Sequence, residues 1–276
     1  MATEGYAHPE LLAEPEWLAQ HIADANVRVI DCAALEAYRR AHIRGAVGLP
    51  VHFYIKDPAD ETHVMPADQF AQLMGRLGVG NDTTVVAYDD NNSLVAARLW
   101  WVLQYYGHVN AKVLNGGWHR WLYEGRPITT HATHPEPATF TPRPRPDVLC
   151  TLDELKARVG RPGTQILDVR SDEEWRGEND RGNKRRGHVP GAAHLEWLNF
   201  VSKDDRRIFL PAEELRAMLR SAGVEPGGEV VTYCQGGIRA AHAYFVLKLL
   251  GYNDVRNYDG SMREWANRED TPLVVD

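Results

Sequence analysis

The chain has 276 residues, of which 43% are apolar and 25% are charged, and its formal net charge is −7. This balance predicts an ordinary soluble core, divided into one large or two modest domains. It argues against nucleic acid as the main partner, and no apolar run is long enough to cross a membrane.

The N-terminus and the cysteines indicate a compartment. The first 16 residues lack the basic and apolar regions of a signal peptide. Cys32, Cys150 and Cys234 are far apart and form no CxxC pair, so neither a metal site nor a disulfide framework is predicted. We therefore expect a cytoplasmic protein that needs no metal and no other cofactor.

Strands and helices alternate along the first half of the chain. Helices are predicted over residues 10–22, 66–77 and 93–106, with another starting at Gly117–Trp118, and strands over 27–32, 84–88 and 109–114. Such alternation is typical of the α/β class, in which helices cover both faces of a mostly parallel sheet. Residues 128–147 are rich in Pro and Thr, which predicts an extended, semi-rigid linker between domains at 1–127 and 148–276.

The second half repeats the pattern of the first. The spacing between matching residues is 146 at the histidines and 145 at the tyrosines. The matched segments are Val29–Asp31 with Ile166–Asp168, His42–Ala46 with His188–Ala192, and Val85–Asp89 with Val230–Cys234. Two copies are too few for a solenoid, so we expect two similar α/β domains packed together.

The most informative stretch runs from Glu229 to Leu250. It predicts a buried strand, a tight loop and a helix, with Cys234 at the end of the strand. Gly236 and Gly237 can take positive φ, which turns successive backbone N–H groups toward one point. The helix start adds further unpaired N–H groups, and such surroundings favour a thiolate. Arg239 would offer a bidentate donor to an arriving anion.

A lone cysteine is more often a small buried hydrophobic residue, and a Gly-Gly turn can simply reverse the chain. The combination of cysteine, glycines, arginine and helix start within a few residues favours a reactive site. At the matching place the first copy has Asp89, followed by Asn91 and Asn92. A carboxylate would repel an anion and cannot carry sulfur, so the first copy is expected to be a scaffold.

Residues 10–273 together resemble the two-domain rhodanese-type sulfurtransferases. The motifs that carry the resemblance are Asp168–Arg170, Gly187–Ala192, Tyr233–Ala240, and the ending from Asp259-Gly260 to Trp265. The presence of Asp in place of Cys in the N-terminal copy is also what this family shows. Each motif alone is weak, but in combination they are specific.

The resemblance implies a ping-pong transfer of sulfur from a small anionic donor such as thiosulfate to cyanide or a thiol. Cys234 would be the catalytic nucleophile and would carry the sulfur as a persulfide. Substrate-binding roles fall on Gln235, Gly236, Gly237, Ile238, Arg239 and Arg176. Supporting roles fall on Asp168 and Arg170, as an ion pair or a strand cap, and on His188. Because a histidine occupies the same place in both copies, we expect His188 to be structural.

Three alternatives remain beside a thiosulfate enzyme. Members that use 3-mercaptopyruvate usually have Cys-Gly-(Ser/Thr)-Gly-Val-Thr, and an Arg where this chain has Glu174. Phosphatases of related fold have a longer loop, with Arg six positions after Cys, whereas Arg239 is five positions after Cys234. Rhodanese-like binding modules commonly lack the Cys.

A basic run precedes His188. It consists of Arg181, Lys184, Arg185 and Arg186. Such a run is usually a solvated loop, but in an acidic chain it could also guide anions toward the site.

Overall fold

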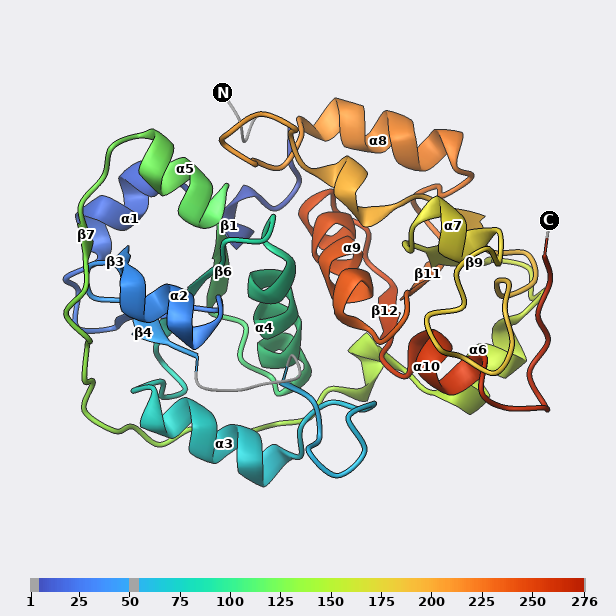
Figure 1. Ribbon diagram of the computed structural model, residues 1–276, viewed down its shortest axis with the longest axis horizontal. Coiled ribbons are helices and arrows are strands. Elements are labelled where there is room, and N and C mark those ends of the chain that lie inside the picture. The colour runs from blue at the N-terminus through green and yellow to red at the C-terminus, as the bar shows by residue number, and fades with distance from the viewer. Residues whose placement is uncertain (1–4, 50–54, 276) are drawn as a thin grey trace.

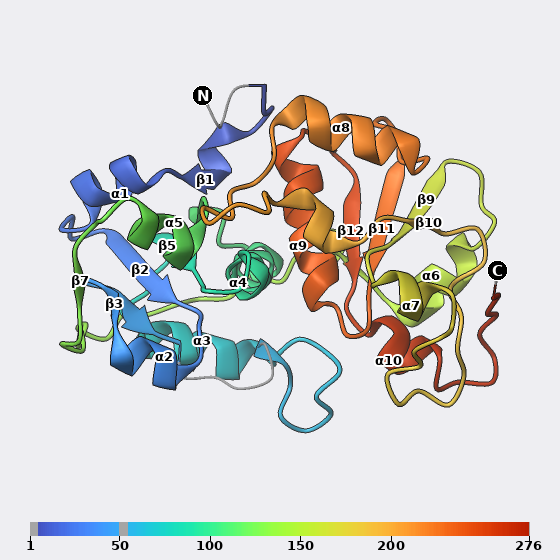
Figure 2. The ribbon, with the colours of Figure 1, turned by 45° about the horizontal axis from the view of Figure 1, so that its top comes forward.

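Two parallel sheets form the two halves of the molecule, each with helices packed against it (Figures 1 and 2). The computed structural model describes residues 5–49 and 55–275, so the outermost ends of the predicted domains, at residues 1 and 276, lie outside the described residues. The predicted α/β fold with two similar units is confirmed by this architecture.

The first sheet has the strand order β1-β6-β5-β2-β4. Its strands are β1 (Leu12–Ala13), β2 (Val27–Asp31), β4 (Val47–Gly48), β5 (Thr84–Tyr88) and β6 (Ala111–Leu114). The helices of this half are α1 (Pro15–His21), α2 (Leu35–Arg40), α3 (Ala67–Arg76), α4 (Leu94–Tyr105) and α5 (Gly117–Tyr123), preceded by the 3₁₀ turn η1 (Pro9–Leu11). A small antiparallel pair, β3 (His42–Ile43) and β7 (Ile128–Thr129), lies beside it.

The second sheet has the order β10-β9-β11-β12-β8, which is the same arrangement built from the second copy. Its strands are β8 (Leu149–Cys150), β9 (Thr164–Asp168), β10 (Ala193–His194), β11 (Glu229–Tyr233) and β12 (Val255–Tyr258). The helices are α6 (Leu152–Arg158), α7 (Asp172–Trp175), α8 (Ala212–Ser221), α9 (Ile238–Leu249) and α10 (Ser261–Trp265), with 3₁₀ turns η3 (Pro146–Val148) and η4 (Trp197–Phe200).

The single helix predicted over residues 10–22 is wrong. Leu12 and Ala13 form the edge strand β1, which pairs in parallel with β6, and the helix begins only at Pro15. Proline lacks the backbone N–H that a helix interior needs and is tolerated in the first turn. The apolar spacing of the leucines therefore comes from an edge strand followed by a short helix.

The two halves meet along α4 and α9, which lie side by side in the middle of the molecule (Figures 1 and 2). Both helices are buried almost all round, because each covers its own sheet on one side and the other helix on the opposite side. Trp100 packs edge-on against Phe245, with 5.0 Å between ring centroids. This apolar seam fixes how the first domain is placed against the second.

The repeat extends to side-chain contacts. In the first domain His42 stacks on Tyr38, with ring centroids 3.8 Å apart, and its Nδ1 lies 2.7 Å from the Tyr38 carbonyl oxygen. In the second domain His188 stacks on Trp175 at 3.4 Å, and its Nδ1 lies 3.1 Å from the Trp175 carbonyl oxygen. The same histidine contact thus occurs in both copies, whether or not the copy contains the loop cysteine.

The Pro- and Thr-rich segment between the domains has no helix or strand over residues 130–145. It lies against the first domain, since the amide of Ala138 donates to the Gly75 carbonyl at 2.9 Å and Phe140 packs edge-on against Phe70. Its first two residues form β7, so strand pairing continues past the boundary predicted at residue 127. None of the helices in the described ranges is both long and apolar enough to span a membrane.

Candidate active site

Cys234 lies directly after β11, the central strand of the second sheet, and four residues before the start of α9. The carboxyl ends of parallel strands are where open α/β sheets place their ligands. Val230, Val231 and Thr232 are fully buried, so the strand is held firmly where the loop begins. The predicted strand–loop–helix unit is therefore present, with the sulfur at its turn.

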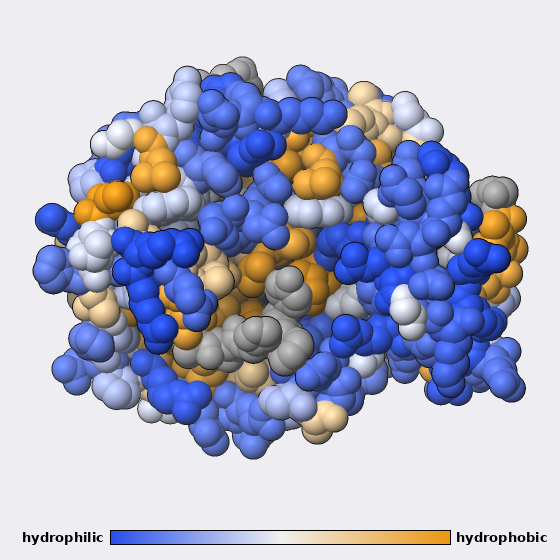
Figure 3. Space-filling view, viewed as in Figure 1, coloured by the Kyte–Doolittle hydropathy of each residue, from blue (hydrophilic) through white to orange (hydrophobic). Residues whose placement is uncertain are grey.

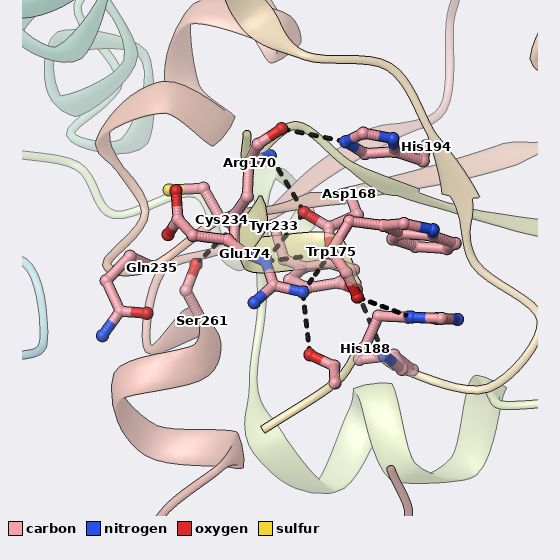
Figure 4. A network of polar contacts seen from close by, with 12 residues as sticks. Asp168, Arg170, Glu174, Trp175, His188, His194, Tyr233, Cys234, Gln235 and Ser261 are labelled. Atoms are coloured by element: carbon pink, nitrogen blue, oxygen red, sulfur yellow. Dashed lines mark hydrogen bonds and ion pairs between the residues drawn. The ribbon is translucent and has the colours of Figure 1, made fainter. Parts of the chain in front are cut away.

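The start of α10 holds the cysteine backbone in place. The Cys234 amide donates to the Ser261 hydroxyl at 3.0 Å (Figure 4). The Ser261 hydroxyl donates in turn to the Tyr258 carbonyl at 2.8 Å. In return, the amides of Met262 and Arg263 donate to the carbonyls of Cys234 and Gln235 at 3.0 and 2.8 Å. The loop is thus tied to an element of the Asp259-Gly260 ending, which carried no assigned role in the sequence.

The two loop glycines differ. Gly237 adopts φ +79° at the N-terminus of α9, whereas Gly236 lies outside the left-handed region, so the expectation that both take positive φ is wrong. A Cβ on Gly237 would lie 2.3 Å from Oδ1 of Asp259, while a Cβ on Gly236 would meet nothing within 4 Å. Close approach of Asp259 is therefore a second reason for glycine at position 237.

The loop amides keep their donors open. Among the described residues, the backbone N–H groups of Gln235, Gly236, Gly237, Ile238 and Arg239 form no hydrogen bond to a protein acceptor. The first amide of the helix ladder is that of Ala241, which donates to the Gly237 carbonyl at 3.0 Å. Unpaired amides at the N-terminus of a twelve-residue helix provide a binding place for negative charge.

A pocket of about 310 Å³ opens over this loop. Its described lining consists of Lys56, Glu61, Leu94, Arg181, Cys234, Gln235, Gly236, Ile238, Arg239 and Arg263. Four of these side chains are cationic and one is acidic, which favours an anion in a chain whose net charge is −7. Apolar residues appear in a hollow near the middle of the face in Figure 3, bordered by hydrophilic ones.

Arg239 lines the pocket, but its guanidinium is already paired with a carboxylate of the chain, so its substrate-binding role stays a prediction. Its guanidinium donates to both carboxylate oxygens of Glu174, at 2.6 and 2.8 Å. Burial opposes these charges, yet the pair raises the pKa of Arg239 and lowers the pKa of Glu174. Both groups stay charged at neutral pH. Glu174 also closes the capping box of α7 with Ser171, which fixes its backbone.

Gln235 and Arg176, two other residues predicted to bind substrate, are both paired with side chains of the protein. Gln235 lines the pocket, but its amide pairs with Asn183 in both directions, at 3.0 and 3.1 Å. Arg176, the residue directly after α7, is half exposed and pairs with Asp172, the first residue of that helix, at 2.9 Å. Arg176 is not among the residues that line the pocket, so its position gives no support to a substrate-binding role.

The predicted supporting residues lie behind the loop. Asp168 and Arg170 form a buried ion pair with contacts of 2.6 to 3.0 Å, and Arg170 also donates to the Gly187 carbonyl (Figure 4). Burial would lower the pKa of Arg170, but Asp168 raises it. The Val189 amide donates to the Tyr233 hydroxyl at 3.1 Å. These contacts join the end of β9 to the strand that carries Cys234.

Of the basic run before His188, Arg181 lines the pocket, and its Nε lies 4.0 Å from Glu174. Arg185 instead donates to the carbonyls of Thr271 and Trp265, so its charge is used to hold the C-terminal segment. Arg181 therefore lies where an incoming anion would pass, whereas Arg185 is a structural residue and not part of a solvated loop.

Sequence reasoning missed the contribution of the first domain. Lys56, Glu61 and Leu94 all line the pocket, although the first copy was expected to be a scaffold. No local motif marks these residues, because each reaches the pocket only through the packing of the two domains. Asp259 was part of a recognised motif, but its contact with Gly237 needed the structure. In the described part of the chain, no group of three or more His, Cys, Asp or Glu side chains could hold a metal ion.

Solved structures with similar folds include the wild-type structure of EanB, with a TM-score of 0.87 over 97% of this chain and 70% of that one, at 24% identity. The anaerobic ergothioneine biosynthesis enzyme from Chlorobium limicola gives the same TM-score over 98% of this chain and 71% of that one, also at 24% identity. At this identity the likeness shows the fold alone.

Curated relatives match the chain over nearly its whole length. The sulfur carrier protein TtuD of Thermus thermophilus is 38% identical over 98% of both chains. The thiosulfate sulfurtransferase of Corynebacterium glutamicum is 34% identical over 99% of this chain and 93% of its own, and a putative thiosulfate sulfurtransferase, SseA of Mycobacterium tuberculosis, is 35% identical over 98% and 92%. The family description "Rhodanese-like domain" matches residues 14–124 and 151–268. The chain therefore belongs to the rhodanese family and consists of two rhodanese-like domains in tandem.

Proposed function

We propose that this enzyme moves the outer sulfur of thiosulfate to a thiol or cyanide acceptor through a persulfide on Cys234. The observation that carries the proposal is the loop after β11, where Cys234 lines a cation-rich pocket and the backbone amides of the residues that follow it have no protein acceptor. Curated relatives named thiosulfate sulfurtransferase support the reaction class. The domain limits proposed above, 1–127 and 148–276, place all of this loop in the second domain.

The first half-reaction uses the thiolate of Cys234 as nucleophile. It attacks the outer sulfur of thiosulfate, a new S–S bond forms, and the old S–S bond breaks with its electron pair leaving on sulfite. The loop amides would stabilise the negative charge of the persulfide and of the departing group. Holding the sulfur covalently divides one transfer into two easier ones.

In the second half-reaction a thiolate or cyanide attacks the terminal sulfur, and Cys234 leaves as a thiolate. A relative named as a sulfur carrier protein favours a thiol as the acceptor in the cell. The three cysteines are unpaired thiols, which fits the reducing cytoplasm that we propose as the location.

The donor preference rests on Glu174. A donor with its own carboxylate, such as 3-mercaptopyruvate, would have to compete with Glu174 for the guanidinium fork of Arg239. Thiosulfate has no carboxylate, and Arg181 and Arg263 of the pocket lining remain available to it. We therefore propose thiosulfate as the better donor.

Steady-state kinetics with both donors tests the proposal. Wild-type enzyme should give the higher kcat/KM with thiosulfate and cyanide, and Cys234→Ser should give no turnover with either donor. A higher kcat/KM with 3-mercaptopyruvate would overturn the donor assignment. Hydrolysis of an aryl phosphate would favour the phosphatase alternative, and the absence of turnover with every donor would favour a binding module.

A further inference from the structure

A segment of the first domain reaches across to the catalytic loop. Residues 55–65 form a hairpin-like excursion, closed by a bridge between Lys56 and Val64, that ends beside α10 (Figures 1 and 2). Arg263 of α10 donates to the carbonyl of Glu61 at 2.9 Å, and His63 lies 3.7 Å from Glu264. The excursion is therefore attached to the same element that holds the Cys234 backbone.

Lys56 is the buried cation of this excursion. Its side chain is 4% exposed, and it is one of the residues that line the pocket with Cys234. The ammonium contacts the Thr62 carbonyl, the Asp259 carbonyl at 3.2 Å and the Asp259 carboxylate at 2.8 Å. An ammonium has three N–H donors, so these contacts fix its position and leave none for a substrate.

Two buried cations contact the single carboxylate of Asp259, which leaves a net positive charge in this cluster. Arg98 of α4 already meets its carboxylate at 2.6 Å, so Lys56 is a second cation on the same carboxylate. Asp259 in turn lies against Gly237 of the catalytic loop. A water-excluded site strengthens electrostatic interactions, so an additional negative charge on the nearby sulfur would be favoured by this arrangement.

The other charged groups around the pocket are less suited to this task. Arg239 on α9 is paired with Glu174. Arg181 is 55% exposed. Arg263 donates to the backbone carbonyl of Glu61. Water screens an exposed charge, whereas Lys56 is shielded.

We propose that Lys56 is a positioning residue, supplied by the first domain, whose fixed charge stabilises the thiolate and the persulfide anion of Cys234. The inference deepens the proposed function and rests on it. In this proposal the first domain contributes to catalysis through Lys56, although it has Asp89 and no cysteine at the matching loop position. Burial lowers the pKa of Lys56 to about 8, while Asp259 and Cys234 act to raise it, so at pH 7 the charge is largely present.

The test is the pH profile of Cys234 alkylation by iodoacetamide, followed by mass spectrometry of the Cys234 peptide. Loss of the charge in Lys56→Met should shift the profile to higher pH and slow alkylation at pH 7 about tenfold. Lys56→Arg should restore most of the wild-type profile. Lys248→Met is the matched control, since Lys248 also contacts two backbone carbonyls but lies outside the pocket.

Lys56→Gln gives a second test that also serves if Lys56→Met does not fold. Its amide can still donate to the Asp259 carboxylate but carries no charge, so its profile should also move to higher pH. Coincident profiles for wild type and for a folded Lys56→Met or Lys56→Gln would overturn the proposal. Alkylation needs no sulfur donor, so this failure is distinct from a failure to form a persulfide.

Discussion

The loops after β5 and β11 are the same structural element with opposite contents. In the first domain the carboxylate of Asp89 accepts hydrogen bonds from the amides of Asn91, Ser93, Val95 and Ala96, at 2.7 to 2.9 Å. In the second domain the corresponding amides form no hydrogen bond among the described residues. The first loop therefore contains its own anion, and the second is open for one that arrives.

The bonds to Asp89 also explain how the loop of the first domain stays ordered although it has no nucleophile. Asp89 is 1% exposed, and although burial raises its pKa, the amides act to lower it. The loop of the first domain is one residue longer before its helix begins, at Leu94 rather than at Ile238. The Asp89 carboxylate therefore occupies the loop amides of the first domain, whereas Cys234 leaves those of the second domain available.

The largest expected effect is on activity. Cys234→Ser should lower kcat/KM for thiosulfate by about a thousandfold or more, because the nucleophile is lost. Cys32→Ser and Cys150→Ser should keep nearly full activity, since both thiols are buried away from the pocket lining. Equal activity of Cys234→Ser and wild type would show that the open loop is not the reaction site.

Among the substitutions considered, removal of the Asp89 carboxylate should lower the free energy of unfolding most. Asp89→Ala leaves several buried amides without an acceptor and should lower the free energy of unfolding by about 3 kcal/mol. Urea unfolding followed by fluorescence measures this loss. A change well below 1 kcal/mol would mean that the amides do not depend on the carboxylate.

Substitution of the two loop glycines should destabilise the protein to different extents, because only Gly237 has close neighbours. Gly237→Ala should cost about 2 kcal/mol or more, because Ala must take positive φ and its Cβ would press on Asp259. Gly236→Ala is the matched control, with open space around its Cβ. Thermal unfolding of both variants compares them, and equal losses would contradict the assigned geometry.

The two loops can also be made alike. Cys234→Asp places a carboxylate among the open amides and should be more stable than Cys234→Ser by about 1–2 kcal/mol, with no activity. The comparison is made by urea unfolding at pH 7. A less stable Cys234→Asp would indicate that the second loop does not accept an anion as the first one does.

The smallest effect concerns pH. The contact with Glu264 raises the pKa of His63 to about 9, with burial opposing it and Asp60 adding to it. Because the folded-state pKa lies above the unfolded one, the stabilisation is complete below about pH 6.5 and is lost as pH rises to about 9. His63 is half exposed, so His63→Gln should cost under about 1 kcal/mol at pH 6 and nothing at pH 9.5. A constant difference across this range would refute the assignment.

Most of the fold and the reactive loop could be predicted because the signals are local. Strand patterns, helix starts and the repeated segments lie within a few residues of one another, and Cys234 with its glycines is one such group. The partner of Arg239 could not be predicted, since Glu174 lies 65 residues away and meets it only after folding. Lys56 is farther still, on another domain, and the two-residue strand β1 is too short to give a periodic pattern.

We propose that the transferred sulfur is held on the loop of the second domain and not on that of the first. The direct measurement is intact-protein and peptide mass spectrometry after incubation with thiosulfate, using wild type and Cys234→Ser. We expect one added sulfur atom on the Cys234 peptide of wild type and none anywhere in the variant. A wild-type Cys234 peptide without added sulfur, or an added sulfur on a peptide of the first domain, would contradict this assignment.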